Sequence, residues 1–174
     1  MRDVKIFLIG MMGAGKTSVG LNLSRLLDLP FFDTDDLIGV DSYFDSHSLD
    51  EFRTEEIKQI NQLSNRKGSA IVSVGGGSIL AKQTRDIIRS NSCFFLQASI
   101  NNLIDRIKQQ NISRPLVHFL NNGDIDRIKF RQLYKDREQH YLDLADFIIN
   151  TNNENISNIA MTINRLVLEN EIIN

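Results

Sequence analysis

The stretch GMMGAGKT at residues 10–17 comes directly after the apolar run Ile6–Ile9 and opens a segment of helical periodicity. This order of segments predicts a strand that leads through a glycine-rich loop into a helix. The stretch fits the pattern G-x-x-x-x-G-K-[ST], in which backbone N–H groups face phosphate oxygens, the lysine neutralises them and the hydroxyl ligates Mg²⁺. The chain is therefore expected to bind a nucleoside triphosphate.

The positions within this loop assign individual roles. Lys16 is the expected phosphate-binding lysine, and Thr17 is the expected Mg²⁺ ligand. The expected nucleotide contacts of the loop are Gly13, Ala14, Gly15, Lys16, Thr17 and Ser18. The alternative is a glycine-rich turn in which Lys16 is only a solvated residue at the start of a helix. The agreement between the motif and its setting favours a phosphate loop.

Composition limits the class of protein. The 174 residues, 41% of them apolar, suit one compact domain over residues 1–174. The balance of 20 basic and 22 acidic residues argues against nucleic acid or an anionic membrane as a partner. Met1–Gly15 also has features of a secretory signal, but the Lys16 and Thr17 that follow fit a phosphate loop better. We expect a monomeric, cytoplasmic protein.

Neither the cysteine nor the histidines suggest a catalytic or metal site. The single cysteine, Cys93, starts an apolar run and is expected to be a buried, unreactive thiol. A chain with one cysteine has no internal disulfide, which is consistent with a reducing cytosol. The histidines at positions 47, 118 and 140 lack the spacing of metal ligands, so we interpret them as surface or structural residues.

Short apolar runs alternate with segments of helical period, which is typical of an α/β fold with right-handed crossovers. We predict a three-layer α/β/α architecture with a central parallel five-stranded sheet. The predicted strands are residues 5–9, 30–33, 70–74, 93–96 and 147–150. Three predicted helices have apolar stripes that should pack on the sheet. The stripes are Val19, Leu23, Leu26 and Leu27; Ile100, Leu103, Ile104 and Ile107; and Ile156, Ile159, Ile163, Leu166 and Val167.

Two carboxylates follow the second predicted strand. In an extended strand end, Asp33 and Asp35 would point the same way, towards the edge where a parallel sheet binds ligands. Such a pair beside a triphosphate loop can hold Mg²⁺ with its waters and can orient or deprotonate an attacking hydroxyl. The alternative makes Asp35 or Asp36 the N-cap of the next helix.

Two arginines lie on the apolar faces of predicted helices. Arg53 is spaced by helical turns from Ile57 and Ile60, and Arg137 from Tyr134 and Tyr141. A guanidinium turned inward is costly without an anionic partner. That partner could be a ligand carboxylate, or a carboxylate of the protein itself. The structural candidates are Glu55, Glu56, Asp136 and Glu138.

Two further segments could contact a ligand. Gly75, Gly76 and Gly77 end the third predicted strand and allow a close backbone approach, although a triglycine is also a common flexible turn. Arg114 precedes Pro115 in a polar stretch that we predict to be a mobile lid over about residues 111–123. Such an arginine can move onto transferring phosphates, but taken alone it is a solvated loop cation.

Taken together, these motifs resemble the shikimate kinase family of small P-loop kinases. Their order and separations match over nearly the whole chain. The matching motifs are GMMGAGKT at 10–17, DTD at 33–35, FR at 52–53, GGG at 75–77, RPL at 114–116, and R-x-x-x-Y with LAD at 137–146. The phosphate loop alone is shared by many NTPases, whereas its combination with the later motifs is specific.

The resemblance implies transfer of the γ-phosphoryl group of ATP to the 3-hydroxyl of shikimate, with Mg²⁺ as the metal. It implies that Arg53 and Arg137 bind the substrate carboxylate and that the glycine triplet, through Gly76 N–H, contacts a substrate hydroxyl. It further implies the following roles: Asp35 as candidate base, Asp33 as a Mg²⁺ contact through water, Lys16 as phosphate lysine, Arg114 as lid arginine, and Arg106 as an adenine contact. The substrate-binding segment would span about residues 35–65.

Two segments depart from the family pattern. Ser48 and Leu49 stand where the family usually has Gly-Glu, and the turn at Thr151–Glu154 matches its adenine side poorly. Other functions use the same kind of loop. A kinase for another polyol acid such as gluconate would share it, as would a silent ATP-binding module. A GTP-binding switch would also share it, but the sequence lacks an N-K-x-D motif.

Overall fold

The centre of the computed structural model, which describes residues 3–110 and 117–173, is a parallel five-stranded sheet. The strands lie in the order β2-β3-β1-β4-β5. They are β1 (Lys5–Ile9), β2 (Phe31–Asp33), β3 (Ala70–Ser73), β4 (Ser92–Gln97) and β5 (Phe147–Asn150). The predicted fold class and all five predicted strands are confirmed, with differences of one residue at some boundaries.

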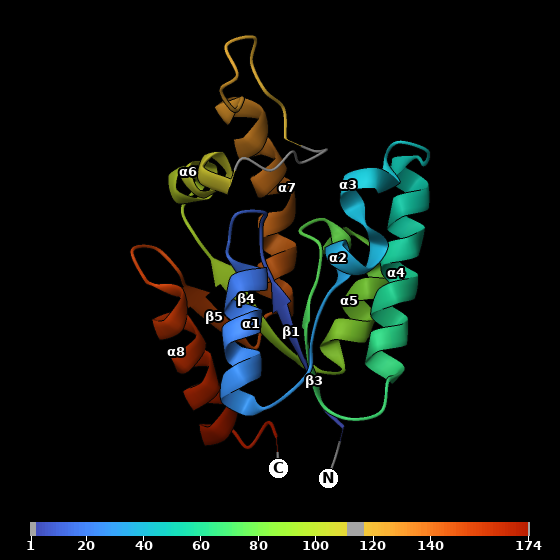
Figure 1. Ribbon diagram of the computed structural model, residues 1–174, viewed down its shortest axis with the longest axis vertical. Coiled ribbons are helices and arrows are strands. Elements are labelled where there is room, and N and C mark those ends of the chain that lie inside the picture. Colours follow the sequence, from blue (N-terminus) through green and yellow to red (C-terminus); the bar gives the residue numbers. More distant parts are fainter. Residues whose placement is uncertain (1–2, 111–116, 174) are drawn as a thin grey trace.

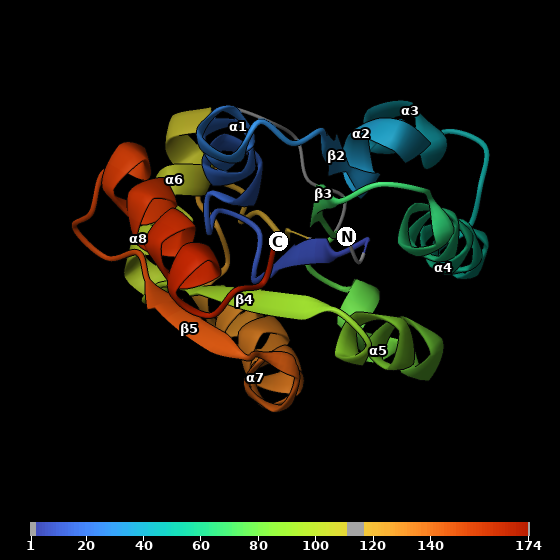
Figure 2. The same ribbon diagram turned by 90° about the horizontal axis from the view of Figure 1, so that it is seen from below.

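Helices cover both faces of the sheet. Figure 2 shows α1 (Lys16–Leu27) and α8 (Ile156–Glu169) on one side of the strands, with α5 (Lys82–Arg89) and α7 (Arg127–Leu144) on the other. The remaining helices are α2 (Thr34–Ile38), α3 (Val40–Tyr43), α4 (Leu49–Asn65), the short 3-10 helix η1 (Ser78–Leu80) and α6 (Ile100–Gln110). The two covered faces give the predicted three layers.

The central strand β1 shows why its sequence is apolar at successive positions. Ile6 and Leu8 pack into the core beneath α1, α6 and α8, whereas Phe7 and Ile9 pack into the core beneath α4, α5 and α7. Alternate side chains of a strand point to opposite faces, so a central parallel strand buries both sets.

Two of the predicted apolar stripes need correction at one residue each. Leu26 is 48% exposed, because the buried face of α1 is centred on Gly20 and Leu23 and Leu26 lies to one side of it. Ile156 is 40% exposed, because it is the first residue of α8 and precedes the buried face that starts at Ile159. The other members of the stripes are buried or half-buried.

The parallel arrangement brings the carboxyl ends of the strands to one edge of the molecule. Figure 1 shows α6 and the start of α7 on one side of this edge, with α2, α3 and the start of α4 on the other. Ligands of open parallel sheets bind at such an edge. Among the described helices, none combines the length and apolar character needed to span a membrane.

Candidate functional site

The phosphate loop connects β1 to α1 and requires glycine where it passes other elements. Gly10 and Gly13 have φ angles of +146° and +82°. A Cβ atom at Gly10 would lie 2.6 Å from the carbonyl oxygen of Leu96, and one at Gly13 would lie 2.7 Å from that of Leu103. No real Cβ tolerates these contacts, so the loop is held closely against β4 and α6 by glycine alone.

The loop ends at the N-terminus of α1, where the helix dipole favours an anion. Gly15 is the N-cap and supplies no capping side chain, so the first N–H groups of the helix are not satisfied by one. The Nζ of Lys16 donates to the carbonyl oxygens of Gly10, at 2.9 Å, and Met11, at 3.3 Å. These bonds hold the ammonium group along the loop.

Asp33 connects the phosphate loop to α2, on the other side of the strand edge. Its Oδ2 accepts from Thr17 Oγ1 at 2.6 Å, and its Oδ1 accepts from the backbone N–H of Asp35 at 3.1 Å. Asp33 is therefore the N-cap of α2, so the interpretation of Asp35 or Asp36 as the cap is wrong. The prediction that Asp33 and Asp35 share an extended strand end is also wrong, because β2 ends at Asp33 and Asp35 lies in α2, which begins at Thr34.

The glycine triplet between β3 and η1 is the point where the predicted site residues meet. A Cβ atom at Gly75 would lie 2.7 Å from Asp35 Oδ1 and would clash with Glu56 Oε1, and one at Gly77 would clash with the guanidinium of Arg53. At Gly76 a Cβ atom would lie 3.3 Å from the carbonyl oxygen of Gly10 in the phosphate loop. The backbone of the triplet therefore lies between the phosphate loop on one side and the side chains of Asp35, Arg53 and Glu56 on the other.

Arg53 is held by a carboxylate of the protein. It forms an ion pair with Glu56, whose side chain is 1% exposed and also accepts from Ser78 Oγ at 2.6 Å. The structural pairing that the sequence left open is thus formed for Arg53. It does not enclose the guanidinium, because the Arg53 side chain stays 20% exposed and lies against Gly77.

Arg137 differs from Arg53, because none of the ion pairs among the described residues includes it. Its side chain is almost fully buried, and its Nη1 lies 3.5 Å from the sulfur of Met11 in the phosphate loop. Its Nε has no hydrogen-bond partner among the described residues. Burial lowers the pKa of Arg137. The predicted alternative of pairing with Asp136 or Glu138 is therefore wrong for this arginine.

Arg106 reaches from α6 towards both the loop and the turn after β5. Its guanidinium donates to the carbonyl oxygen of Thr151 at 2.5 Å, to Thr151 Oγ1 at 3.0 Å and to the carbonyl oxygen of Gly13 at 3.5 Å. The residue predicted to pack against adenine thus lies beside the phosphate loop. The same contacts join this loop to the turn that matched the family poorly.

Two groups at this edge have a place that sequence reasoning missed. Glu56 was named only as a structural partner, but it contacts both Arg53 and the glycine triplet. Ser73, the last residue of β3, lies beside Asp33 in the sheet, and its buried hydroxyl has no partner among the described residues. A hydroxyl residue two positions before a triglycine was the available signal for Ser73.

Arg114 lies outside the described residues, together with most of the segment predicted as the start of the lid. The described part of that segment forms a turn joined by an antiparallel bridge between Phe119 and Ile125. Lys108 of α6 forms an ion pair with Asp124 beside this turn.

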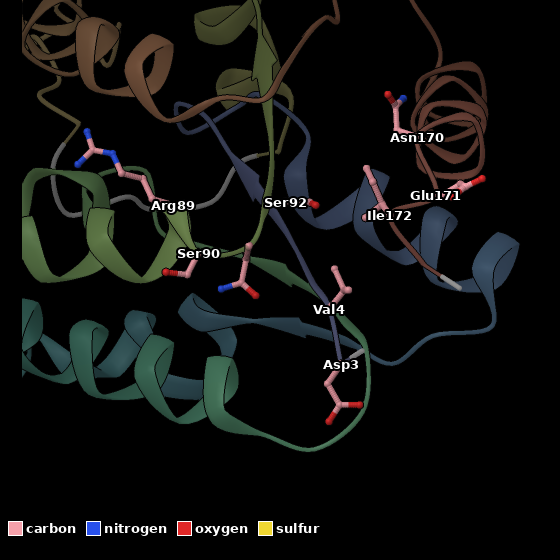
Figure 3. A pocket seen from close by; sticks show the side chains of 9 residues that line it. Asp3, Val4, Arg89, Ser90, Ser92, Asn170, Glu171 and Ile172 are labelled. Atoms are coloured by element: carbon pink, nitrogen blue, oxygen red, sulfur yellow. The ribbon is translucent and has the colours of Figure 1, made fainter. Parts of the chain in front are cut away.

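A hollow of about 640 Å³ lies outside the candidate site. Figure 3 shows side chains from the residues just before β1, from the end of α5 through the turn to the first residue of β4, and from the residues after α8. Its members are Asp3, Val4, Arg89, Ser90, Asn91, Ser92, Asn170, Glu171 and Ile172. None of the predicted site residues lines it. Over residues 3–110 and 117–173 there is also no group of three or more metal-binding side chains.

Comparisons with known proteins agree with this geometry. The family model described as shikimate kinase matches residues 12–167. The chain belongs to the shikimate kinase family. A shikimate kinase of Francisella tularensis subsp. holarctica is 33% identical over 99% of each chain, and one of Buchnera aphidicola is 33% identical over 94% of this chain and 96% of its own.

A solved shikimate kinase structure extends the likeness to three dimensions. The enzyme from Acinetobacter baumannii, in complex with shikimate, superimposes with a TM-score of 0.85 at 30% identity, over 98% of this chain and 96% of its own. The family match covers every described residue of the candidate site from Gly13 to Arg137. The shikimate kinase fold and the residues that meet at the strand edge therefore point to the same class of enzyme.

Proposed function

We propose that the chain is a shikimate kinase, which transfers the γ-phosphoryl group of ATP to the 3-hydroxyl of shikimate and gives shikimate 3-phosphate and ADP. The observation that carries this proposal is Arg137. It is a buried guanidinium that forms no ion pair with a carboxylate of the described residues, and it lies between the phosphate loop and the glycine triplet. A small carboxylic acid bound there supplies the anion that a buried arginine requires.

The acceptor half of the site binds the acid through two arginines. Arg137 supplies a charge that forms no ion pair within the described part of the chain, and Arg53 is oriented by Glu56 while the far side of its guanidinium lies at Gly77. A guanidinium has five donors in a rigid fork, so the bond to Glu56 leaves others for a ligand. In this proposal the N–H of Gly76, with its neighbours in the triplet, donates to a hydroxyl of the substrate.

The nucleotide half of the site neutralises phosphate. The amides of Gly13–Ser18, the N-terminus of α1 and Lys16 surround the phosphates of ATP, and Arg106 contacts the adenine. Arg114 adds positive charge from the lid, although it lies outside the described residues. Phosphoryl transfer needs positioning and charge stabilisation more than covalent help, so these groups suffice for the nucleotide.

The residues between the two halves fit a magnesium ion. Thr17 Oγ1 and Asp33 Oδ2 are hard oxygen donors that lie 2.6 Å apart beside the phosphate loop. In the proposal Thr17 ligates Mg²⁺ directly and Asp33 holds it through water. When bound, the ion would offset the negative charge of the phosphates.

Asp35 is the proposed general base. Its carboxylate lies at Gly75, between the glycine triplet and the end of β2. From there it can accept the proton of a hydroxyl that attacks a phosphate held by the loop. Asp35 thus orients the acceptor, Lys16 holds the phosphate, and the arginines fix the acid.

One assay tests the proposal against its alternative, a kinase for another polyol acid. We expect wild-type protein with Mg²⁺ and ATP to release ADP when shikimate is added, and not with gluconate or a nucleoside monophosphate. Lys16→Ala should abolish turnover, whereas the control Lys82→Ala, at an exposed residue of α5, should not change it. ADP release with gluconate alone would replace shikimate as the acceptor, and no stimulated release would indicate a silent ATP-binding module.

The cellular setting stays part of the same proposal. A role in aromatic amino-acid biosynthesis, a cytoplasmic location and a monomeric state follow from the resemblance and the composition. Size-exclusion chromatography with light scattering tests the monomer directly, because a dimer doubles the mass of 19.9 kDa.

A further inference from the structure

Tyr141 of α7 is a fully buried residue to which the proposed transfer assigns no role. It lies four residues after Arg137, on the same face of the helix. Its ring stacks on Phe95 of β4, with centroids 5.0 Å apart and an angle of 22° between the planes. The packing explains the ring of Tyr141 but leaves its hydroxyl to be explained.

The hydroxyl of Tyr141 contacts two parts of the candidate site, the glycine triplet and the phosphate loop. It donates to the carbonyl oxygen of Gly76 and lies 4.0 Å from the sulfur of Met11. The same sulfur lies 3.5 Å from Nη1 of Arg137. Burial raises the pKa of Tyr141, and the nearby charge of Arg137 opposes that rise. The phenol therefore stays protonated at neutral pH and can keep donating to Gly76.

The bond to Gly76 fixes a peptide plane at the acceptor side of the site. The carbonyl oxygen of Gly76 and the N–H of Gly77 belong to one planar peptide unit, so holding one orients the other. A Cβ atom at Gly76 would lie 3.3 Å from Met12 N of the phosphate loop and 3.5 Å from Arg137 Nη1. Gly76 therefore lies close to both the phosphate loop and Arg137, and a rotation of its peptide would change its contacts with both.

We infer that Tyr141 is a positioning residue, whose hydroxyl fixes the positions of the glycine triplet and Arg137 relative to each other, so that both can bind the acceptor. The inference rests on the proposed function. It requires that the hydroxyl acts through Gly76 and Arg137 without contacting the substrate. Its effect should fall on the acceptor more than on the nucleotide, because both groups belong to the acceptor half of the site.

The variant Tyr141→Phe tests this role, because it keeps the ring stacked on Phe95 and removes only the hydroxyl. Loss of one buried hydrogen bond should raise the dissociation constant of shikimate about tenfold, with ATP affinity changed by less than about twofold. Calorimetric titration of each ligand alone gives the two constants. Steady-state assays should show a higher KM for shikimate together with a lower kcat.

Tyr134→Phe is the matched control. Tyr134 is a buried tyrosine of the same helix, but it packs in the other core cluster. The variant Tyr134→Phe also loses one hydroxyl, but its affinity for shikimate should stay unchanged. If both variants weaken both ligands in proportion to a loss of folded protein, or if Tyr141→Phe binds shikimate as wild type does, the positioning role is overturned.

A second measurement does not depend on activity. Labelling with ¹⁵N-glycine marks the ten glycines of the chain. Tyr141→Phe should shift the amide signals of Gly76 and Gly77, and Tyr134→Phe should not. Unshifted glycine signals would overturn the inference even if the variant lost activity. If wild-type protein released no ADP with shikimate, the proposed function would fail, and the glycine signals would still decide whether Tyr141 positions the triplet.

Discussion

At the scale of single residues, Arg137 carries a buried charge that forms no ion pair with any carboxylate in residues 3–110 and 117–173. Burial of an unpaired charge is costly, and the lowered pKa of Arg137 reflects that cost. An arginine kept in such a place is better explained by ligand binding than by stability. Function and stability should therefore respond in opposite directions when its charge is removed.

Arg137→Met tests this opposition. We expect the variant to lose at least about 2 kcal/mol of shikimate affinity, which is roughly 30-fold, because a ligand carboxylate loses its charged partner. Its thermal midpoint should be no lower than that of wild type, because an apolar chain of similar length replaces a buried cation. Calorimetric titration and thermal denaturation measure the two effects.

Arg131→Met serves as the control, because Arg131 is an exposed arginine of the same helix. Neither measurement should change in that variant. Unaltered shikimate affinity in Arg137→Met would refute the carboxylate clamp. A large loss of stability would show instead that a group of the protein holds the guanidinium.

At the scale of elements, α4 begins at a capping box that replaces the usual family sequence. Ser48 Oγ accepts from the backbone N–H of Glu51, and the Glu51 carboxylate accepts from the backbone N–H of Ser48 at 2.8 Å. Both orphan donors are satisfied reciprocally. The departure at Ser48 and Leu49 therefore still defines where the helix that carries Arg53 begins.

Ser48→Ala should destabilise the protein by about 0.5–2 kcal/mol in urea denaturation, because it removes the N-cap acceptor. Ser48→Gly should cost only a few tenths of a kcal/mol, because glycine still adopts the cap conformation. Equal stability of Ser48→Ala and wild type would mean that water replaces the cap. Arg53 would then be positioned by its pairing with Glu56 alone.

The same capping box predicts a pH dependence. The hydrogen bond from the backbone N–H of Ser48, followed by that from its hydroxyl, lowers the pKa of Glu51 below 4.5. A lowered pKa stabilises the folded protein at pH values above 4.5, and this contribution is lost as the pH falls through the folded pKa. Wild type should therefore be more stable than Glu51→Gln at pH 7, and urea denaturation should show the difference shrinking in acid. A constant difference would contradict the assignment.

The elements also show what the sequence could and could not predict. Periodicity predicted the strands because parallel strands buried on both faces are continuous apolar runs. It missed the short helices α2 and α3, since four or five residues carry no period. The predicted cap of α2 lay two or three positions too late, because no local pattern shows whether the strand ends at Asp33 or continues to Asp35.

At the scale of the whole molecule, the candidate site lies at the carboxyl ends of the strands, and the opposite edge of the sheet has a structural role. That predicted site residues would gather at the carboxyl ends of the strands followed from the parallel fold. Which residues would touch did not follow, because the strand order that places β3 between β1 and β2 is not written in any local pattern. For this reason the sequence indicated a carboxylate partner within the protein equally for Arg53 and Arg137. Of these two arginines, only Arg53 forms such an ion pair among the described residues.

At the opposite edge, Lys5 at the start of β1 links this strand to the connection between α4 and β3. Its side chain is buried, and its Nζ donates to the carbonyl oxygens of Arg66, at 2.8 Å, and Gly68, at 2.6 Å, in the connection between α4 and β3. Burial is the main cause that lowers the pKa of Lys5. Because the unfolded chain then keeps this proton to higher pH, stability should rise with pH from the folded pKa to 10.5.

Lys5→Met should therefore change stability without changing chemistry. We expect it to lower the free energy of unfolding by about 1–2 kcal/mol near pH 7, since two carbonyl groups lose their donor. It should also lack the rise of stability in alkali, as urea denaturation across pH will show. The turnover and the KM for both substrates should stay at wild-type values, because Lys5 lies at the opposite end of β1 from the phosphate loop. Lys67→Met, at the exposed neighbour between the two carbonyls, should change neither property. A loss of turnover in Lys5→Met that exceeds its loss of folded protein would show that the two edges of the sheet are coupled.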